Sequence, residues 1–199
     1  MPSLLLGTRN PGKVIEIVSI LADSGWSFSS LAEFPSVGEA EENFVTYTEN
    51  AIAKARFYAL ATGLCALADD SGLEVAALGG APGVFSARYA GEHASDADRR
   101  ALLLSELDKR DADRRARFVA VVATATPEGE VLNVSEGICE GTIIFAPRGS
   151  GGFGYDPLFV PDGYDQTFAE LPDSVKNRIS HRGRALAKTR EFLVSCTSC

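Results

Sequence analysis

The sequence lacks any long apolar run. Its amino terminus, Met1-Pro2-Ser3-Leu4-Leu5-Leu6, has no basic segment before the leucines, and a membrane span needs about 18 consecutive apolar residues. We therefore expect a protein that is neither exported nor embedded in a membrane. Repeats and low-complexity tracts are also missing, and 45% hydrophobic with 23% charged residues is a globular balance. We assign residues 1–195 to one domain and residues 196–199 to a short tail.

Cysteine and histidine are scarce. The four cysteines, at 65, 139, 196 and 199, give no disulfide framework for a chain of this length and suit a reducing cytoplasm. The C-x-x-C spacing of Cys196 and Cys199 lacks the further ligands of a zinc site and the surrounding fold of a redox pair. With two histidines, no Ser/His or Cys/His pair is evident, so a water nucleophile fits better than a covalent one.

A concentrated basic stripe is also lacking. The net charge is −8, and the one dense basic run, Lys109 to Arg117, is interleaved with Asp111 and Asp113. That pattern favours a solvated connector, and no nucleic acid is expected as a partner. An anionic ligand of this protein is therefore expected to be small and accompanied by a metal.

The hydrophobic periodicity changes along the chain and predicts a mixed α/β fold. Apolar residues at helical spacing predict helices at 13–21, 48–61, 95–107 and 175–194. Short apolar runs predict strands at 4–6, 65–68 and 158–160, with the run at 65–68 ending in Asp69-Asp70-Ser71-Gly72. Residues 118–125 and 131–145, joined by a turn at 127–129, predict two or three antiparallel strands. We expect two lobes around a substrate cleft.

The first loop, Gly7-Thr8-Arg9-Asn10-Pro11-Gly12-Lys13, precedes a predicted helix. Its backbone amides, hydroxyl, amide side chain and lysine at a helix amino terminus are typical of phosphate binding. The loop also satisfies G-x-x-x-x-G-K, the front of a P-loop. However, Val14 stands where a P-loop places the Ser or Thr that coordinates the metal. An ordinary strand-to-helix turn would explain the loop if it stood alone.

Acidic residues cluster at Glu39, Glu41, Glu42 and Glu49, and again at Asp69-Asp70. Magnesium prefers carboxylate oxygens, which a triphosphate site needs opposite its cations. Solvation explains Glu39 and Glu42 without any function. A carboxylate pair at the end of a buried strand is costly unless it is compensated, although capping a turn through Ser71 and Gly72 could account for one of the two.

Two further segments carry candidate ligand groups. Four glycines in 149–157 surround Phe153, and glycine lets the backbone approach a ligand while an aromatic ring offers a face for stacking a base. Residues 176–183 concentrate cations and donors, including His181, in an otherwise acidic chain. An exposed basic first turn of the last helix would explain the second segment alone.

Six motifs, in order from Thr8 to Ala185, resemble the inosine triphosphate pyrophosphatase family, also called XTP/dITP diphosphatases. Nearly the whole chain is covered. The motifs are Thr8-x-Asn10-x-x-Lys13, Glu41-Glu42 with Thr46-x-x-Glu49-Asn50-Ala51, Ala68-Asp69-Asp70-Ser71-Gly72-Leu73, Ala81-Pro82-Gly83-Val84-x-Ser86-Ala87-Arg88-Tyr89, Gly152-Phe153-Gly154-Tyr155-Asp156-Pro157, and Ile179-Ser180-His181-Arg182-Gly183-x-Ala185.

The resemblance implies hydrolysis of ITP, dITP and XTP to monophosphate and pyrophosphate by a magnesium-dependent, cytoplasmic homodimer with a long mixed sheet and flanking helices. It implies that Glu41 and Asp70 hold Mg²⁺ and that Asp70 is also the general base. The implied substrate contacts are Thr8, Asn10 and Lys13 on phosphates with Lys176 assisting, Ser71, and Phe153 on the base within reach of Asp156, His181 and Arg182. Arg9, Pro11, Gly12, Gly154 and Tyr155 complete the predicted substrate-binding set.

Three alternatives remain open on the sequence. A P-loop ATPase or kinase would use the loop ending at Lys13 and the strand ending at Asp70, but Val14 opposes it. A nucleotide sensor without turnover would use the same phosphate loop and base clamp, yet it gains nothing from a general base. A pyrophosphatase for other nucleotides, such as dTTP or UTP, is a weaker alternative.

Overall fold

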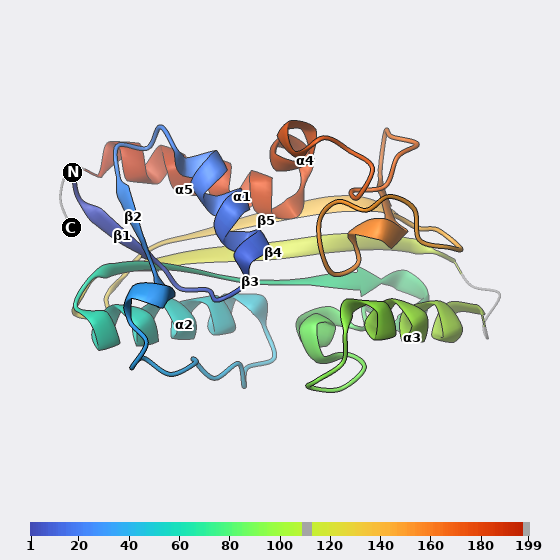
Figure 1. The fold of residues 1–199 in the computed structure, drawn as a ribbon, viewed down its shortest axis with the longest axis horizontal. Coiled ribbons are helices and arrows are strands. Elements are labelled where there is room, and N and C mark those ends of the chain that lie inside the picture. The colour runs from blue at the N-terminus through green and yellow to red at the C-terminus, as the bar shows by residue number, and fades with distance from the viewer. Residues whose placement is uncertain (109–112, 197–199) are drawn as a thin grey trace. The chain divides into compact units, whose positions relative to one another are not determined.

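The computed structural model describes residues 1–108 and 113–196, and Figure 1 shows its ribbon. The strands are β1 (Ser3–Leu6), β2 (Ser27–Ser30), β3 (Cys65–Val75), β4 (Arg115–Ala125), β5 (Val131–Ile143) and β6 (Phe159–Pro161). The α-helices are α1 (Pro11–Leu21), α2 (Tyr47–Thr62), α3 (Asp96–Asp108), α4 (Asp173–Ile179) and α5 (His181–Ser195). Short 3-10 helices lie at Leu31–Glu33, Ala76–Leu78, Gly83–Arg88 and Asp156–Leu158.

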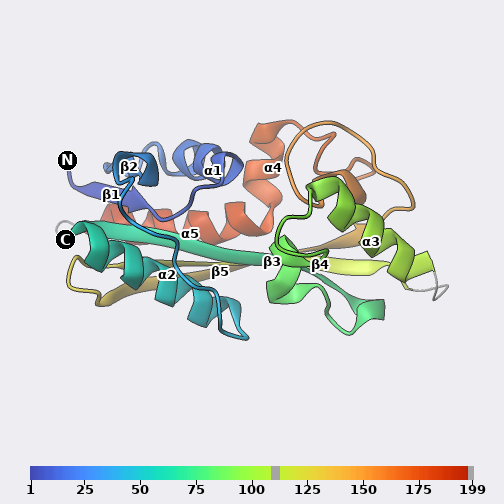
Figure 2. The same cartoon turned by 60° about the horizontal axis from the view of Figure 1, so that its bottom comes forward.

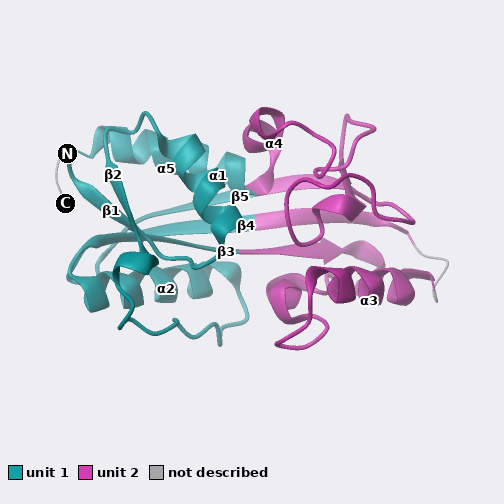
Figure 3. Ribbon diagram, in the orientation of Figure 1, with its two compact units in different colours: residues 1–70, 120–137, 182–199 teal, residues 71–119, 138–181 magenta. Residues whose placement is uncertain are grey.

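The strands form one mixed sheet in the order β2-β1-β3-β4-β5-β6. β1 is parallel to both β2 and β3, and β5 is antiparallel to β6. The chain forms two compact units, shown in separate colours in Figure 3. Unit 1 comprises residues 1–70, 120–137 and the chain from 182 onward, and unit 2 comprises residues 71–119 and 138–181. The predicted α/β class with a mixed sheet and flanking helices is confirmed.

Unit 1 packs helices on both faces of its part of the sheet. Successive side chains of a strand point to opposite faces, so Leu4 and Leu6 join a cluster with α1 and α5, whereas Leu5 joins a cluster with α2. Figure 2 shows α2 on one side of these strands and α1 and α5 on the other. β1 is thus packed on both faces by apolar clusters. Its carboxyl end leads directly into the loop before α1, so these clusters hold the start of that loop.

Unit 2 has its own apolar core. Leu103 and Leu107 of α3 pack with Phe118, Phe159 and Phe168. The Phe118 ring meets Phe159 edge-on at a centroid distance of 4.7 Å, a favourable arrangement of aromatic quadrupoles. The glycine-rich loop (residues 149–157) is attached to this core through Tyr155, and Leu158, the residue after the loop, belongs to the same cluster.

Most predicted helices and strands are confirmed, with ends that shift by a few residues. α1 begins at Pro11 because the Asn10 side chain caps it, its Oδ1 accepting from the Gly12 and Lys13 amides at 2.9 and 3.2 Å. The predicted pair at 118–125 and 131–145 is β4 and β5, and β4 begins three residues earlier, at Arg115. β2 had no counterpart in the prediction, since Ser27-Phe28-Ser29-Ser30 carries one apolar residue.

Two predicted boundaries are wrong. The strand expected at 65–68 continues to Val75, so Asp69-Asp70-Ser71-Gly72 is part of β3 and not a turn. The single helix expected at 175–194 is two helices, because Ser180 adopts an extended conformation with φ −67° and ψ 160°. Both errors fall on polar segments, whose residues Asp69, Asp70 and Arg182 form ion pairs and hydrogen bonds with distant parts of the chain. Hydrophobic periodicity does not report such contacts.

The remaining expectations concern the connector, the tail and the membrane. Residues 109–112 of the basic run and residues 197–199 of the tail, with Cys199, lie outside the described residues. The described part of the basic run is paired with acids, Arg115 with Asp113 at 2.5 Å and Arg117 with Glu74 at 2.8 Å. None of the described cysteines forms a disulfide. No helix in the described residues is long and apolar enough to cross a membrane.

Candidate functional site

The loop between β1 and α1 presents a helix amino terminus at the surface. Thr8 Oγ1 accepts from the Asn10 amide at 3.2 Å, and Asn10 in turn caps α1. Arg9 donates to the Val37 carbonyl at 2.6 Å and thereby holds the loop against the segment before α2. Asn10 and Pro11 are exposed, and Gly12 and Lys13 are half-buried. These hydrogen bonds hold the loop in one conformation next to the amino terminus of α1, which is the positive end of the helix dipole.

Lys13 begins a chain of buried ion pairs within unit 1. Its Nζ lies 3.0 Å from Asp69 Oδ2, the same oxygen that accepts from Arg182 Nε at 3.1 Å. Arg182 also donates from Nη1 to Glu16 Oε2 at 2.6 Å. Asp69 and Arg182 are 1% and 3% exposed, so these charges are satisfied by one another.

The electrostatics of Asp69 follow from these partners. Burial by itself would raise the pKa of Asp69, but the charges of Lys13, Arg182 and Lys54 outweigh burial and hold the pKa below its usual range. Burial, with Lys54 and Arg182 nearby, lowers the pKa of Lys13 despite the attraction of Asp69. Asp69 is therefore a permanent anion that anchors two cations.

Asp70 has the opposite environment. Burial first, and the charge of Glu42 second among the unfavourable contributions, raise its pKa to about 6, against the opposing effects of Lys54, Lys13 and the Asn50 hydrogen bond. Asn50 donates from Nδ2 to Asp70 Oδ2 at 3.0 Å, and its amide also binds both backbone groups of Phe44. Asp70, 5% exposed, is the poorly compensated member of the acidic pair.

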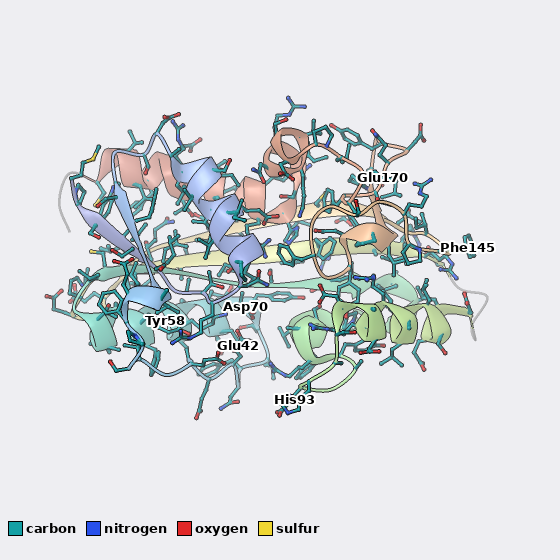
Figure 4. All side chains as sticks on the ribbon, viewed as in Figure 1. Glu42, Tyr58, Asp70, His93, Phe145 and Glu170 are labelled. Atoms are coloured by element: carbon teal, nitrogen blue, oxygen red, sulfur yellow. The ribbon has the colours of Figure 1, made fainter. Side chains whose placement is uncertain are left out.

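Glu42, rather than Glu41, lies with Asp70. Lys54 Nζ contacts Glu42 Oε1 at 2.5 Å and donates to the Asp69 carbonyl at 2.9 Å, which brings Glu42 to the middle of β3. Figure 4 labels Glu42 and Asp70 beside each other. Glu41 is exposed, and its Oε2 accepts from the Asn43 side chain at 2.8 Å.

The fit of a divalent cation rests on these two carboxylates. Among the described residues, no three or more His, Cys, Asp or Glu side chains gather as a metal site. Magnesium is commonly bound through one or two carboxylates and completed by water and substrate phosphates. Burial is the largest cause of the raised pKa of Asp70, and the negative charge of Glu42 adds to it. A bound cation would stabilise both carboxylates in their charged form.

The glycine-rich loop, in unit 2, is built around Asp156. Asp156 Oδ2 accepts from the Phe153 amide at 2.8 Å and from Lys176 Nζ at 2.7 Å. Lys176 Nζ also lies 5.1 Å from the centroid of the Phe153 ring, within cation–π range. Gly152 has φ +68°, and a Cβ there would overlap Asp156 Oδ2. The half-buried Phe153 ring is thus held on a stiff loop beside a buried cation.

Several residues that were predicted to contact the substrate are buried in this structure. Tyr155 is 4% exposed and donates from its hydroxyl to the Ser86 carbonyl at 3.0 Å. His181 is buried and stacks on Phe118 at a centroid distance of 4.5 Å. Lys176 belongs with Phe153 and Asp156 in unit 2, whereas Lys13 belongs to unit 1. The substrate contacts assigned to these residues, to Ser71 and to Arg182 stay predictions.

Sequence reasoning gave no role to Lys54, Asn50 or Glu16, and it attributed Glu42 to solvation. Lys54 and Asn50 carried a usable signal, because they occur at i and i+4 on the face of α2 that also holds Ala51, Ala55 and Tyr58, all of which are buried. A lysine and an amide among buried alanines require polar partners. Glu16 and Arg182 carried no such signal, since 166 residues separate them in the chain.

Comparison with known proteins gives consistent matches over nearly the whole chain. The sequence pattern of the Ham1 family matches residues 4–192. A dITP/XTP pyrophosphatase of Desulforamulus reducens is 52% identical over 191 residues, which are 96% of this chain and 94% of the relative. A dITP/XTP pyrophosphatase of Thermus thermophilus is 51% identical, covering 92% and 87% of the two chains. The solved structure of a HAM1 protein from Coxiella burnetii matches with a TM-score of 0.90 at 45% identity, over 98% of this chain and all of the other.

Proposed function

Because this chain belongs to the Ham1 family, we propose that it hydrolyses the non-canonical purine nucleoside triphosphates dITP, XTP and ITP to monophosphate and pyrophosphate. The observation that carries the proposal is one cluster in unit 1, in which the carboxylates Asp70 and Glu42 lie with the buried ammonium groups of Lys13 and Lys54. A triphosphate reaction requires both charge types, cations for the phosphate oxygens and carboxylates for the metal and the proton.

Glu42 and Asp70 would hold a magnesium ion. This assignment replaces Glu41, the carboxylate implied by resemblance, with its neighbour, because the charge of Glu42 acts on Asp70. When bound, the ion supplies positive charge to the phosphate oxygens. The ammonium of Lys54, paired with Glu42 at 2.5 Å, orients that carboxylate.

The remaining steps belong to the chain's own residues. Lys13, Thr8 and Asn10 would bind phosphate oxygens at the amino terminus of α1. Asp70 would accept a proton from the attacking water, whose oxygen forms a bond to phosphorus while the bond to pyrophosphate breaks. The lysines offset the charge that develops on the leaving group. Asp69 would keep Lys13 in position, since their contact is 3.0 Å and buried.

The purine base would stack on Phe153. Support comes from the stiffness of its loop and from the cation 5.1 Å from its ring. Stacking is tolerant of base identity, so discrimination against adenine and guanine needs hydrogen-bonding groups at the base edge. Asp156, His181 and Arg182 are the candidates that the resemblance gives for that role.

We further propose a cytoplasmic homodimer, as the family resemblance implies. The small anionic substrate, rather than a nucleic acid, suits a net charge of −8. Light scattering of the purified protein tests the dimer directly.

The function is tested by incubating the protein and magnesium with a panel of nucleoside triphosphates and scoring pyrophosphate and orthophosphate separately. We expect pyrophosphate with dITP, XTP and ITP, and little turnover of ATP, GTP, dTTP or UTP. Orthophosphate or a phosphorylated acceptor would support the P-loop alternative instead. Tight binding without any product would support a sensor.

A further inference from the structure

Two side chains of α3 bind both polar backbone groups of Gly154. The Gly154 amide donates to Asp96 Oδ2 at 2.7 Å, and the Gly154 carbonyl accepts from Arg100 Nη1 at 2.7 Å. Asp96 and Arg100 stand at i and i+4, so they project from the same face of the helix. Both bonds are charge-assisted, which makes them stronger than bonds between neutral groups.

Both polar backbone groups of the adjacent residue, Phe153, are also hydrogen-bonded, in this case to Asp156. Its amide donates to Asp156 Oδ2 at 2.8 Å, and its carbonyl accepts from the Asp156 amide at 3.1 Å. All four backbone polar groups of Phe153 and Gly154 are therefore engaged. The direction in which the Phe153 side chain leaves the backbone is fixed by these bonds.

Asp96 is itself braced. Arg99 lies 3.3 Å from Asp96 Oδ1 and donates to the carbonyls of Ala87 and Ala94 at 2.6 and 2.8 Å. The amino terminus of α3 is capped by other residues: Asp98 Oδ2 accepts from the Ser95 amide at 2.9 Å. The helix thus has its own cap, and Asp96 is available for the loop.

We propose that Asp96 and Arg100 are positioning residues that preset the Phe153 ring for the nucleotide base. The inference rests on the proposed function, in which Phe153 stacks on the base. Holding a ring in its bound orientation removes an ordering cost from binding. The pair acts on the backbone behind the ring, so its effect is the same for every base and falls on KM rather than on kcat.

The test is steady-state kinetics of Asp96→Ala and Arg100→Met with dITP and XTP. We expect KM to rise about five- to tenfold for both substrates with kcat within about twofold, the size that the ordering cost of one side chain implies. Asp96→Asn keeps an acceptor for the Gly154 amide, and it should return KM to near the wild-type value. Asp98→Ala is the matched control, because it opens the helix cap without touching Gly154, and its KM should stay unchanged.

The double variant Asp96→Ala/Phe153→Ala separates this inference from the proposed function. We expect it to have the KM of Phe153→Ala alone, since the pair acts only through the ring. If Phe153→Ala itself leaves KM unchanged, the stacking assignment fails. If Phe153→Ala raises KM but Asp96→Ala behaves like Asp98→Ala, or adds its full effect in the double variant, the positioning role is overturned.

Discussion

Asp69 and Asp70 are adjacent in sequence, yet their carboxylates experience opposite fields. Asp69 shares one oxygen between Lys13 and Arg182, whereas Asp70 accepts from the Asn50 side chain at 3.0 Å and is buried near the charge of Glu42. Successive residues of β3 point to opposite faces, so each carboxylate meets a different set of neighbours. The two adjacent aspartates therefore differ: Asp69 anchors two cations, and Asp70 is the proposed general base.

The raised pKa of Asp70 gives a stability prediction for the metal-free protein. Its folded-state pKa of about 6 exceeds the usual 3.8, so between pH 4 and 6 the folded state keeps a proton that the unfolded state has lost. The free energy of unfolding consequently falls as pH rises through that window, and the full cost remains above it. Burial is the main cause of the raised pKa; the charge of Glu42 adds to it, and the charges of Lys54 and Lys13 oppose it.

Asp70→Asn removes the cost of ionising a buried carboxylate, and it keeps the size of the side chain and an oxygen that can accept a hydrogen bond. We expect the variant to be more stable than wild type by on the order of 2 kcal/mol at pH 7 and to show little difference at pH 4. Urea unfolding at both pH values in the presence of EDTA measures this. If the two proteins differed in free energy of unfolding by the same amount at both pH values, the ionised Asp70 carboxylate would not destabilise the folded state.

Substitutions of Glu41 and Glu42, two adjacent glutamates, test which of them is the second carboxylate ligand of the magnesium ion. Glu42→Gln should raise the magnesium concentration needed for half-maximal activity at least tenfold, since half of the proposed carboxylate set loses its charge. Glu41→Gln, on an exposed side chain bonded to Asn43, should leave the magnesium dependence as in wild type. Magnesium titrations of both variants with dITP decide between them, and the reverse pattern would restore Glu41.

At the scale of elements, the sequence predicts helices better than it predicts where polar segments end. α1, α2 and α3 follow apolar spacing and capping residues, which are local signals. β3 continues through Asp69-Asp70-Ser71-Gly72. Lys13 of α1 pairs with the Asp69 carboxylate there, and Lys54 of α2 donates to the Asp69 carbonyl, so its polar partners come from distant parts of the chain. The break at Ser180 likewise separates His181 and Arg182 from α4, and no periodicity marks it. The Glu42 contact depends on Lys54, twelve residues away, so composition alone could not choose it over Glu41.

The glycine-rich loop offers a prediction at the same scale. Gly152→Ala places a Cβ against Asp156 Oδ2, so Asp156 must move away from the Phe153 amide and Lys176. Gly163→Ala is the control, because Gly163 also has a positive φ, +84°, but open space around its Cβ position.

Both variants should lose about 1–2 kcal/mol of stability from the left-handed backbone, and Gly152→Ala should lose more. Gly152→Ala alone should raise KM for dITP several-fold. Thermal unfolding and kinetics of the two proteins measure these effects. Equal stability loss and equal KM would mean that Asp156 does not hold the loop.

At the scale of the whole molecule, the two halves of the proposed chemistry belong to different units. The carboxylates and lysines of the phosphate reaction lie in unit 1, and Phe153, Asp156 and Lys176 lie in unit 2. The ion pairs of Lys13 with Asp69 and of Lys54 with Glu42 join residues of unit 1, and the ion pair of Lys176 with Asp156 joins residues of unit 2. Changes in unit 1 should therefore act on turnover and metal dependence, and changes around Phe153 on nucleotide affinity.

The products that wild type and Asp70→Asn form from dITP with magnesium test the proposed function and the role of Asp70 most directly. We predict that wild type releases one pyrophosphate for each monophosphate, with no orthophosphate. The folded Asp70→Asn protein should lose at least about two orders of magnitude in kcat/KM, the scale of a missing general base and metal ligand. Orthophosphate from wild type, or near-normal pyrophosphate release by folded Asp70→Asn, would contradict these proposals.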